Sequence, residues 1–96
     1  MSKGAHFRHR ADANHWQILA ALKKVTAVRD IHNCPGGIGD ILARHTKTGE
    51  AVFLEVKASP KDHLTAAEEE FSFDFWANWA RVHTVDEALW AIGLDM

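Results

Sequence analysis

Glu55 and Lys57 are charged residues in the segment 51–57, AVFLEVK, whose alternating pattern predicts a β-strand. Their side chains point to the same face of that strand, about 7 Å apart at the usual rise per residue. Charges on an apolar strand are costly unless they have partners or hold a metal ion. An edge strand with a solvated Glu-x-Lys face would explain the same residues, so the surrounding sequence must decide between the two interpretations.

Asp40 follows the glycine-rich segment 36–39 and opens a second predicted strand, 41–44. A two-residue turn at Lys47-Thr48 would pair residues whose numbers add to 95, which places Asp40 opposite Glu55. Neighbouring carboxylates repel unless a cation lies between them, and a divalent ion prefers such hard oxygen ligands. This register therefore predicts a metal site. A three-residue turn with Gly49 in the left-handed conformation would instead shift the register and turn Asp40 away.

The elements that must position these residues can be predicted from capping and periodicity. Asp12 or Asn14 can cap a first helix that ends near Lys23-Lys24, and Asn14 with Gln17 resembles a capping box. The other expected elements are strands at 25–32, 41–44, 51–57 and 80–83, a helix from Thr65 to about Asn78, and a last helix from Thr84 to Gly93. This αβββαβα order predicts an α/β domain with a mixed sheet flanked by helices.

Composition and length describe an ordinary globular domain. The chain has 96 residues, of which 47% are hydrophobic and 25% charged, and its single cysteine excludes an internal disulfide. No apolar run has the length of a membrane span and the N-terminus has no signal-peptide core, so we expect a cytoplasmic protein with no membrane partner. Residues 1–11 are expected to form a basic flexible arm and residues 12–96 the folded domain.

Charge is unevenly distributed along the chain. Residues 1–61 hold ten Lys/Arg and five Asp/Glu. Residues 62–96 hold only one Lys/Arg but eight Asp/Glu. A basic face could meet phosphate, although a solvated acidic helix would also explain the asymmetry.

With these residues in place, the chain resembles the PD-(D/E)xK nuclease superfamily. More narrowly it resembles the small VRR-NUC-type nucleases common in phage genomes, which are similar to Holliday-junction resolvases. The resemblance covers roughly residues 12–93 and rests on the stretches GGIGDILARHTKTGEAVFLEVK and LTAAEEEF. The second stretch is similar to that family's Leu-Ser/Thr-x-x-Gln helix.

The resemblance implies a restriction-endonuclease-like αβββαβ core and a metal-dependent DNA endonuclease of phage or prophage origin, selective for branched or flapped DNA and working in the cytoplasm of a bacterial host cell. It implies that Asp40, Glu55 and the Val56 carbonyl hold Mg²⁺ or Mn²⁺. Lys57 would orient or help to deprotonate the water that attacks the phosphodiester.

The chain departs from the family pattern at three positions. Gly39 replaces the usual proline, Asn14 or His15 stands where relatives have a first-helix acid, and Glu68 replaces the helix glutamine. Glu68 and His15 are further catalytic candidates. A zinc site is not predicted, because the seven histidines and Cys34 form no Cys-x-x-Cys or matched histidine pattern.

The expected partners are DNA and a second copy of the chain. The residues expected to contact nucleic acid are Arg8, Arg10, Arg44, Lys47 and Lys61. Phe71, Phe75 and Trp79 follow helical spacing and are expected in the core, whereas Phe73 and Trp76 lie off that stripe and suggest a homodimer interface. Two alternatives stay open: a non-cleaving nucleic-acid-binding module on the same fold, and a small interaction or inhibitor protein.

Overall fold

The computed structural model describes residues 12–94, so the expected arm at 1–11 lies outside the described residues. The elements follow in the predicted αβββαβα order, with one 3₁₀ turn added. They are α1 (Ala13–Lys23), β1 (Val28–Asp30), β2 (Ile41–Arg44), β3 (Ala51–Val56), α2 (Ala66–Asp74), η2 (Trp76–Asn78), β4 (Trp79–Val82) and α3 (Val85–Ala91).

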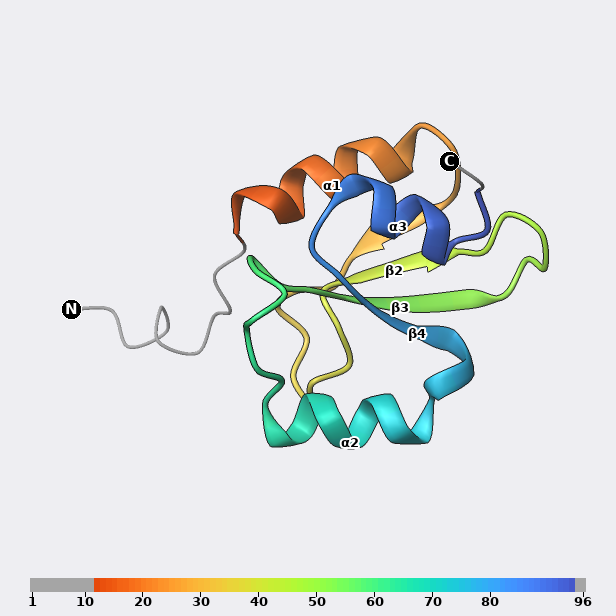
Figure 1. Cartoon of the computed structure of the whole chain (residues 1–96). Coiled ribbons are helices and arrows are strands. Elements are labelled where there is room, and N and C mark those ends of the chain that lie inside the picture. Colours follow the sequence, from red (N-terminus) through yellow and green to blue (C-terminus); the bar gives the residue numbers. More distant parts are fainter. Residues whose placement is uncertain (1–11, 95–96) are drawn as a thin grey trace.

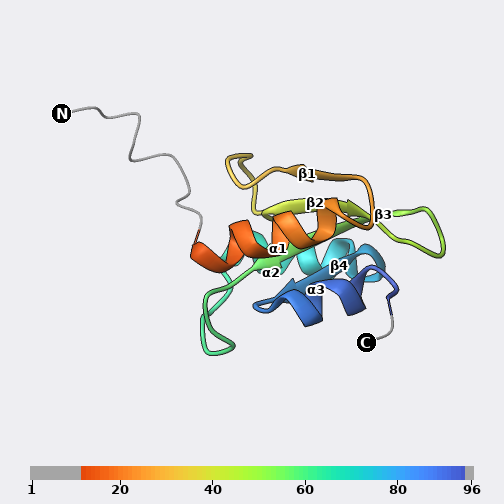
Figure 2. The same cartoon turned by 90° about the horizontal axis from the view of Figure 1, so that it is seen from above.

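The four strands form one mixed sheet in the order β1-β2-β3-β4. The first two pairings are antiparallel and the pairing of β3 with β4 is parallel. Helices α1 and α3 cover one face of the sheet and α2 covers the other (Figure 1), and the view from above shows α1 and α3 running over the same face (Figure 2). The predicted α/β class with a mixed, helix-flanked sheet is confirmed, while the restriction-endonuclease-like assignment stays a prediction.

The register between β2 and β3 is the one that brings Asp40 toward Glu55. Ile41 pairs with Leu54, so paired numbers add to 95 as predicted. The turn itself has four residues, 46–49, and is closed by the His45 N–H, which donates to the Glu50 carbonyl at 2.8 Å. Gly49 is in the left-handed region with φ +78°, yet the register is not shifted. A turn of four residues, 46–49, differs from a turn of two, 47–48, by one added residue on each side. The same residues of β2 and β3 therefore remain paired.

The core lies between the sheet and the α1/α3 layer. All the buried apolar residues belong to this layer and to the sheet face beneath it, and Ile18, Leu22, Ile41, Leu54 and Ile92 have no exposed surface. Val52, Leu54 and Val56 supply the β3 side of this core, as their alternation predicts. None of the helices within residues 12–94 combines the length and the apolar character needed to cross a bilayer.

The opposite face, under α2, is packed more loosely. Phe53 of β3 lies 5.1 Å, centroid to centroid, from Phe71, which stacks on Phe75 at 4.5 Å. The expectation that Phe75 is a core residue is wrong: 49% of its surface is exposed. Trp79 is only partly buried. The physical reason is that, within residues 12–94, α2 is the single α-helix on this face, so no second α-helix closes over its aromatic residues.

Of the two expected caps of α1, Asp12 occupies the cap position and Asn14 lies inside the helix. The expected bounds of β1 and α2 differ from the structure. Strand β1 is shorter than 25–32, because the Val25 and Thr26 N–H groups still bond to the Leu22 carbonyl at the end of α1. Helix α2 ends at Asp74 and the chain continues through η2, so the expected single helix to Asn78 is wrong at its C-terminal end.

Candidate active site

Asp40, Glu55 and Glu68 line one pocket of about 150 Å³, at the end of the sheet where β3 leads toward α2. All three carboxyl side chains belong to buried residues, with 4%, 2% and 7% of their surface exposed. His32 and Cys34 line the same pocket. A larger hollow of about 660 Å³ lies along β4 and α3, but none of the predicted site residues lines it.

Asp40 is fixed by its backbone and its side chain. Its N–H donates to the Leu54 carbonyl at 2.8 Å, and its own carbonyl accepts from Ile31 at 2.9 Å. Oδ2 of Asp40 accepts from the Val56 N–H at 2.8 Å. Gly39 permits this close approach, since it has φ +122° and a Cβ there would lie 3.2 Å from the Leu54 carbonyl oxygen. The carboxylate is therefore held against β3 one residue beyond Glu55.

Glu68 is placed by the capping box that starts α2. The Thr65 hydroxyl accepts from the Glu68 N–H at 3.1 Å, and Oε1 of Glu68 accepts from the Thr65 N–H at 2.8 Å. The Thr-x-x-Glu spacing is typical of this box, and the box turns the glutamate inward: Glu68 is the one buried residue of α2. A local helix-start signal thus delivers the third carboxyl group to the pocket.

Lys57 joins the carboxyl groups. Its Nζ lies 2.9 Å from Oε1 of Glu68 and 3.7 Å from Oε2 of Glu55. Burial lowers the pKa of Lys57, but the hydrogen bond with Glu68 and the charges of Glu68, Glu55 and Asp40 together outweigh it and leave that pKa above its ordinary value. Burial likewise opposes ionisation of Glu68, yet the bonds from Thr65 and Lys57 bring the pKa of Glu68 below its ordinary value.

Glu55 carries the largest perturbation. Burial first, and then the carboxyl groups of Asp40 and Glu68, raise the pKa of Glu55 to about 9. At neutral pH the cluster therefore retains a proton on Glu55. Three carboxyl groups that share a proton in a small buried pocket have the hard oxygen donors and the unbalanced negative charge that suit a divalent ion. Asp40, Glu55 and Glu68 thus fit Mg²⁺ or Mn²⁺.

The structure brings some of the predicted site residues together and separates others. Asp40, Glu55 and Glu68 line one pocket, and Lys57 pairs with Glu55 and Glu68. Val56 reaches the site through its N–H, and a role for its carbonyl stays a prediction. His15 does not line this pocket but belongs to a neighbouring group.

The residues expected to contact nucleic acid are not gathered on one surface. Arg44 ends β2 and Lys47 lies in the turn 46–49, so both are at the opposite end of the β2–β3 hairpin from Asp40 (Figure 1). Lys61 is exposed in the loop after β3, at the pocket end of the sheet. Arg8 and Arg10 lie outside the described residues. Among the described residues that were expected to contact DNA, only Lys61 lies at the pocket end of the sheet.

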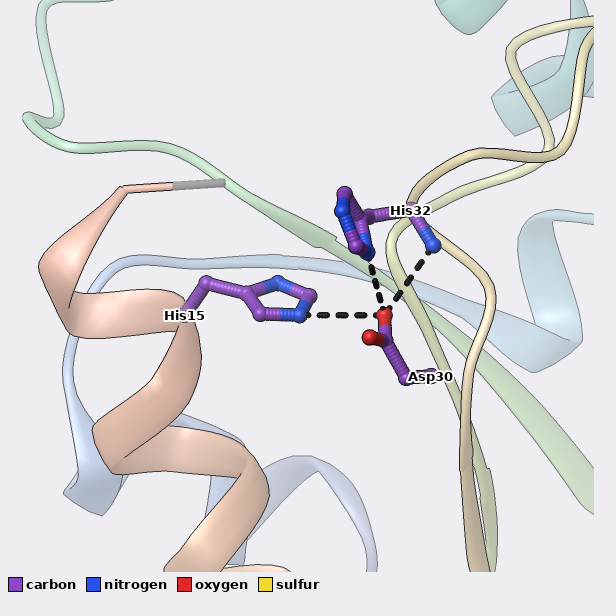
Figure 3. A group of neighbouring side chains, drawn as sticks. All are labelled: His15, Asp30 and His32. Carbon is purple, nitrogen blue, oxygen red and sulfur yellow. Dashed lines mark hydrogen bonds and ion pairs between the residues drawn. The ribbon is translucent and has the colours of Figure 1, made fainter. Parts of the chain in front are cut away.

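Sequence reasoning missed a second polar group, His15, Asp30 and His32, drawn in Figure 3. Nε2 of His15 and Nδ1 of His32 lie 3.1 and 2.6 Å from Oδ1 of Asp30. Burial opposes ionisation of Asp30, but hydrogen bonds from His32 and the charges of both histidines bring the pKa of Asp30 below its ordinary value. The one local signal was Asp-x-His at the end of β1, because His15 joins the group only through tertiary packing.

Comparisons of the chain with protein-family models, with curated proteins and with solved structures gave no match.

Proposed function

We propose that this protein is a metal-dependent nuclease that hydrolyses phosphodiester bonds in DNA. The observation that carries the proposal is the burial of Glu55 between Asp40 and Glu68, with the Lys57 ammonium 2.9 Å from Glu68. A purely structural ion pair needs one carboxylate for one ammonium. Here three carboxyl groups line one pocket beside a single lysine, and this excess of acidic groups over cations suits the binding of a metal ion.

Each residue has a role that follows from its atoms. Asp40, Glu55 and Glu68 would hold the cation, with Asp40 oriented by the Val56 N–H. The bound cation would supply a Lewis acid that stabilises the negative charge developing on the phosphate. Lys57 would orient the attacking water and stabilise charge beside it, because its ammonium can only donate hydrogen bonds. The pocket lining would position the scissile group close to these donors.

DNA as the substrate, and a preference for branched or flapped forms, are supported by the resemblance to the PD-(D/E)xK nucleases and by the basic character of residues 1–61. Of the residues that carry the resemblance, Asp40 and Glu55 line the pocket, and Nζ of Lys57 lies 3.7 Å from Oε2 of Glu55. The same resemblance supports a restriction-endonuclease-like core, a phage or prophage origin and work in the cytoplasm of a bacterial host.

The test is a cleavage panel with the full chain. Labelled linear, flapped and four-way-branched DNA are incubated with Mg²⁺, Mn²⁺ or EDTA, and DNA binding is measured in parallel at several salt concentrations. We expect cleavage with either ion, none with EDTA, and faster cutting of a branched or flapped substrate. Salt-dependent binding without cleavage would favour the non-cleaving module, and absence of both would favour an interaction protein.

A further inference from the structure

His15, Asp30 and His32 come from three separate places in the chain: the first turns of α1, the last residue of β1 and the loop that follows it. One ligand atom from each lies within 4.8 Å of the other two. Figure 3 shows both imidazole rings turned toward the Asp30 carboxylate. Two nitrogen donors and one oxygen donor therefore converge on a point outside the carboxyl cluster of Asp40, Glu55 and Glu68.

The group is held in this arrangement by its surroundings. His15 has only 1% of its surface exposed, and its ring packs edge-on against Trp16 at 4.6 Å and His32 at 5.1 Å. The His32 N–H also donates to Oδ1 of Asp30 at 3.2 Å. Asp30 keeps 29% of its side chain exposed, which leaves a route for an ion from solvent. A ligand set that is ordered in advance loses little conformational entropy when an ion binds.

We propose that His15, Asp30 and His32 form a binding site for a late first-row divalent ion such as Zn²⁺. Imidazole nitrogen with a carboxylate oxygen suits Zn²⁺, Co²⁺ and Ni²⁺, whereas Mg²⁺ prefers oxygen ligands throughout. On binding, the ring nitrogens that face Asp30 give their lone pairs to the ion, and each proton they carried moves to the other ring nitrogen or to solvent.

An ion at this site would have three protein ligands, and the partly exposed Asp30 leaves the site open to a ligand from solvent, the arrangement of zinc sites that are not purely structural. His32 also lines the pocket that contains Asp40 and Glu55, so the two groups are neighbours. The proposal does not depend on the nuclease activity. It concerns a different set of donors and a different class of metal, and it can hold whether or not the protein cuts DNA.

The test uses Co²⁺ as a spectroscopic substitute for Zn²⁺. The full chain, freed of metal, is titrated with Co²⁺ near pH 7.5, and visible d–d absorption is recorded with and without excess Mg²⁺. The variants His32→Ala and Asp30→Asn each remove one ligand. His83→Ala is the matched control, because His83 is also a partly exposed histidine that pairs with a carboxylate, Glu87, at 2.9 Å. Glu55→Gln separates this site from the carboxylate pocket. Circular dichroism confirms that each variant is folded.

We expect d–d bands that saturate at one Co²⁺ per chain, persist in excess Mg²⁺ and disappear when Zn²⁺ is added. His32→Ala and Asp30→Asn should weaken Co²⁺ binding by about 10–100-fold or more, since losing even an outer partner of a ligand has an effect of that size. His83→Ala and Glu55→Gln should leave the bands unchanged. Wild-type Co²⁺ affinity in His32→Ala, or loss of the bands in Glu55→Gln alone, would overturn the proposal and leave the group a hydrogen-bonded triad.

Discussion

At the scale of single residues, the site is defined by the proton that Glu55 holds, for which a bound cation would compete. Burial and the carboxyl groups of Asp40 and Glu68 raise the pKa of Glu55 to about 9. In an unfolded chain the same group ionises near pH 4.5. Without metal, the folded protein therefore holds a proton on Glu55 at pH values where the unfolded chain has released it. The free energy of unfolding must then depend on pH.

The free energy of unfolding in EDTA should fall as pH rises from about 4.5 to about 9. In this window the folded protein holds a proton on Glu55 that the unfolded chain has released, so raising pH favours unfolding, by up to about 1.4 kcal/mol per pH unit for one group. Glu55→Gln leaves an uncharged side chain at this position at every pH and should remove the part of the slope that Glu55 contributes. Urea unfolding of both proteins between pH 6 and 9 measures it, with Glu70→Gln, an exposed carboxyl on α2, as the control. Equal slopes in wild type and Glu55→Gln would refute this ionisation scheme.

Lys57→Met should lower the turnover of DNA cleavage by about 10²–10⁴, the usual scale for one acid–base or electrostatic group. Mn²⁺ affinity should not fall, because the ammonium is no metal ligand and its removal takes away a like charge. Lys24→Met, which alters an exposed lysine at the end of α1, provides the control. Single-turnover rates and Mn²⁺ titrations distinguish the two effects. A variant that lost Mn²⁺ affinity but kept its rate in excess Mn²⁺ would contradict the role given to Lys57.

At the scale of elements, the site depends on how the glycine-rich loop lies against the start of α2. A Cβ on Gly37 would lie 2.7 Å from the Ala67 carbonyl carbon and from the Glu68 backbone nitrogen. The first turn of α2 can therefore approach the loop only because that residue has no side chain. The same close approach brings Glu68 to Asp40 and Glu55.

Gly37→Ala should push α2 away and damage the site. Gly36→Ala is the matched control: both glycines have positive φ, +67° and +92°, but a Cβ on Gly36 would meet only Ile38, at 3.8 Å. In both variants an alanine in the left-handed region should lower the free energy of unfolding by roughly 1–2 kcal/mol. Gly37→Ala should lose about 1–3 kcal/mol more through overpacking, and it should also bind Mn²⁺ more weakly. Urea unfolding and Mn²⁺ titration measure both, and equal losses in the two variants would show that the close contact with α2 is unimportant.

Local signals made the elements and much of the carboxyl cluster predictable. The alternation in β3, the capping box at Thr65 and the pairing sum between β2 and β3 are each visible within a few residues, and the structure has all three. The exposure of Phe75 could not be predicted from helical spacing, because spacing identifies an apolar stripe but not whether another element covers it. The His15, Asp30 and His32 group depends on the packing of α1 beside β1, for which the sequence has no local signal.

At the scale of the whole molecule, the apolar surface on the α2 side remains open. Phe73 and Trp76 have 75% and 77% of their surface exposed, as expected for residues off the helical stripe. Leaving such side chains in water forfeits roughly 1.5–3 kcal/mol each. A two-fold interface would bury them against their own copies and set two pockets at a fixed separation.

We therefore predict a homodimer through this face, and a soluble monomer for the double variant Phe73→Glu with Trp76→Glu. Trp90→Glu is the control, because Trp90 is comparably exposed, at 68%, but lies on α3 at the other side of the sheet (Figure 1). It should leave the dimer intact. Light scattering at tens of micromolar protein gives the masses. A monomeric wild type would rule out the interface and reassign Phe73 and Trp76 to contacts with another partner.

The carboxyl cluster of Asp40, Glu55 and Glu68 is where we expect the metal-dependent hydrolysis of DNA to take place. The most direct measurement is the single-turnover cleavage rate with saturating Mg²⁺ for wild type, Asp40→Asn, Glu55→Gln and the exposed-site control Glu70→Gln. Each of the first two substitutions replaces an anionic oxygen ligand by an amide while relieving carboxylate crowding, so both variants should stay folded and lose cleavage. Glu70→Gln should cut like wild type. If Asp40→Asn or Glu55→Gln also cuts like wild type, the site is not where hydrolysis takes place.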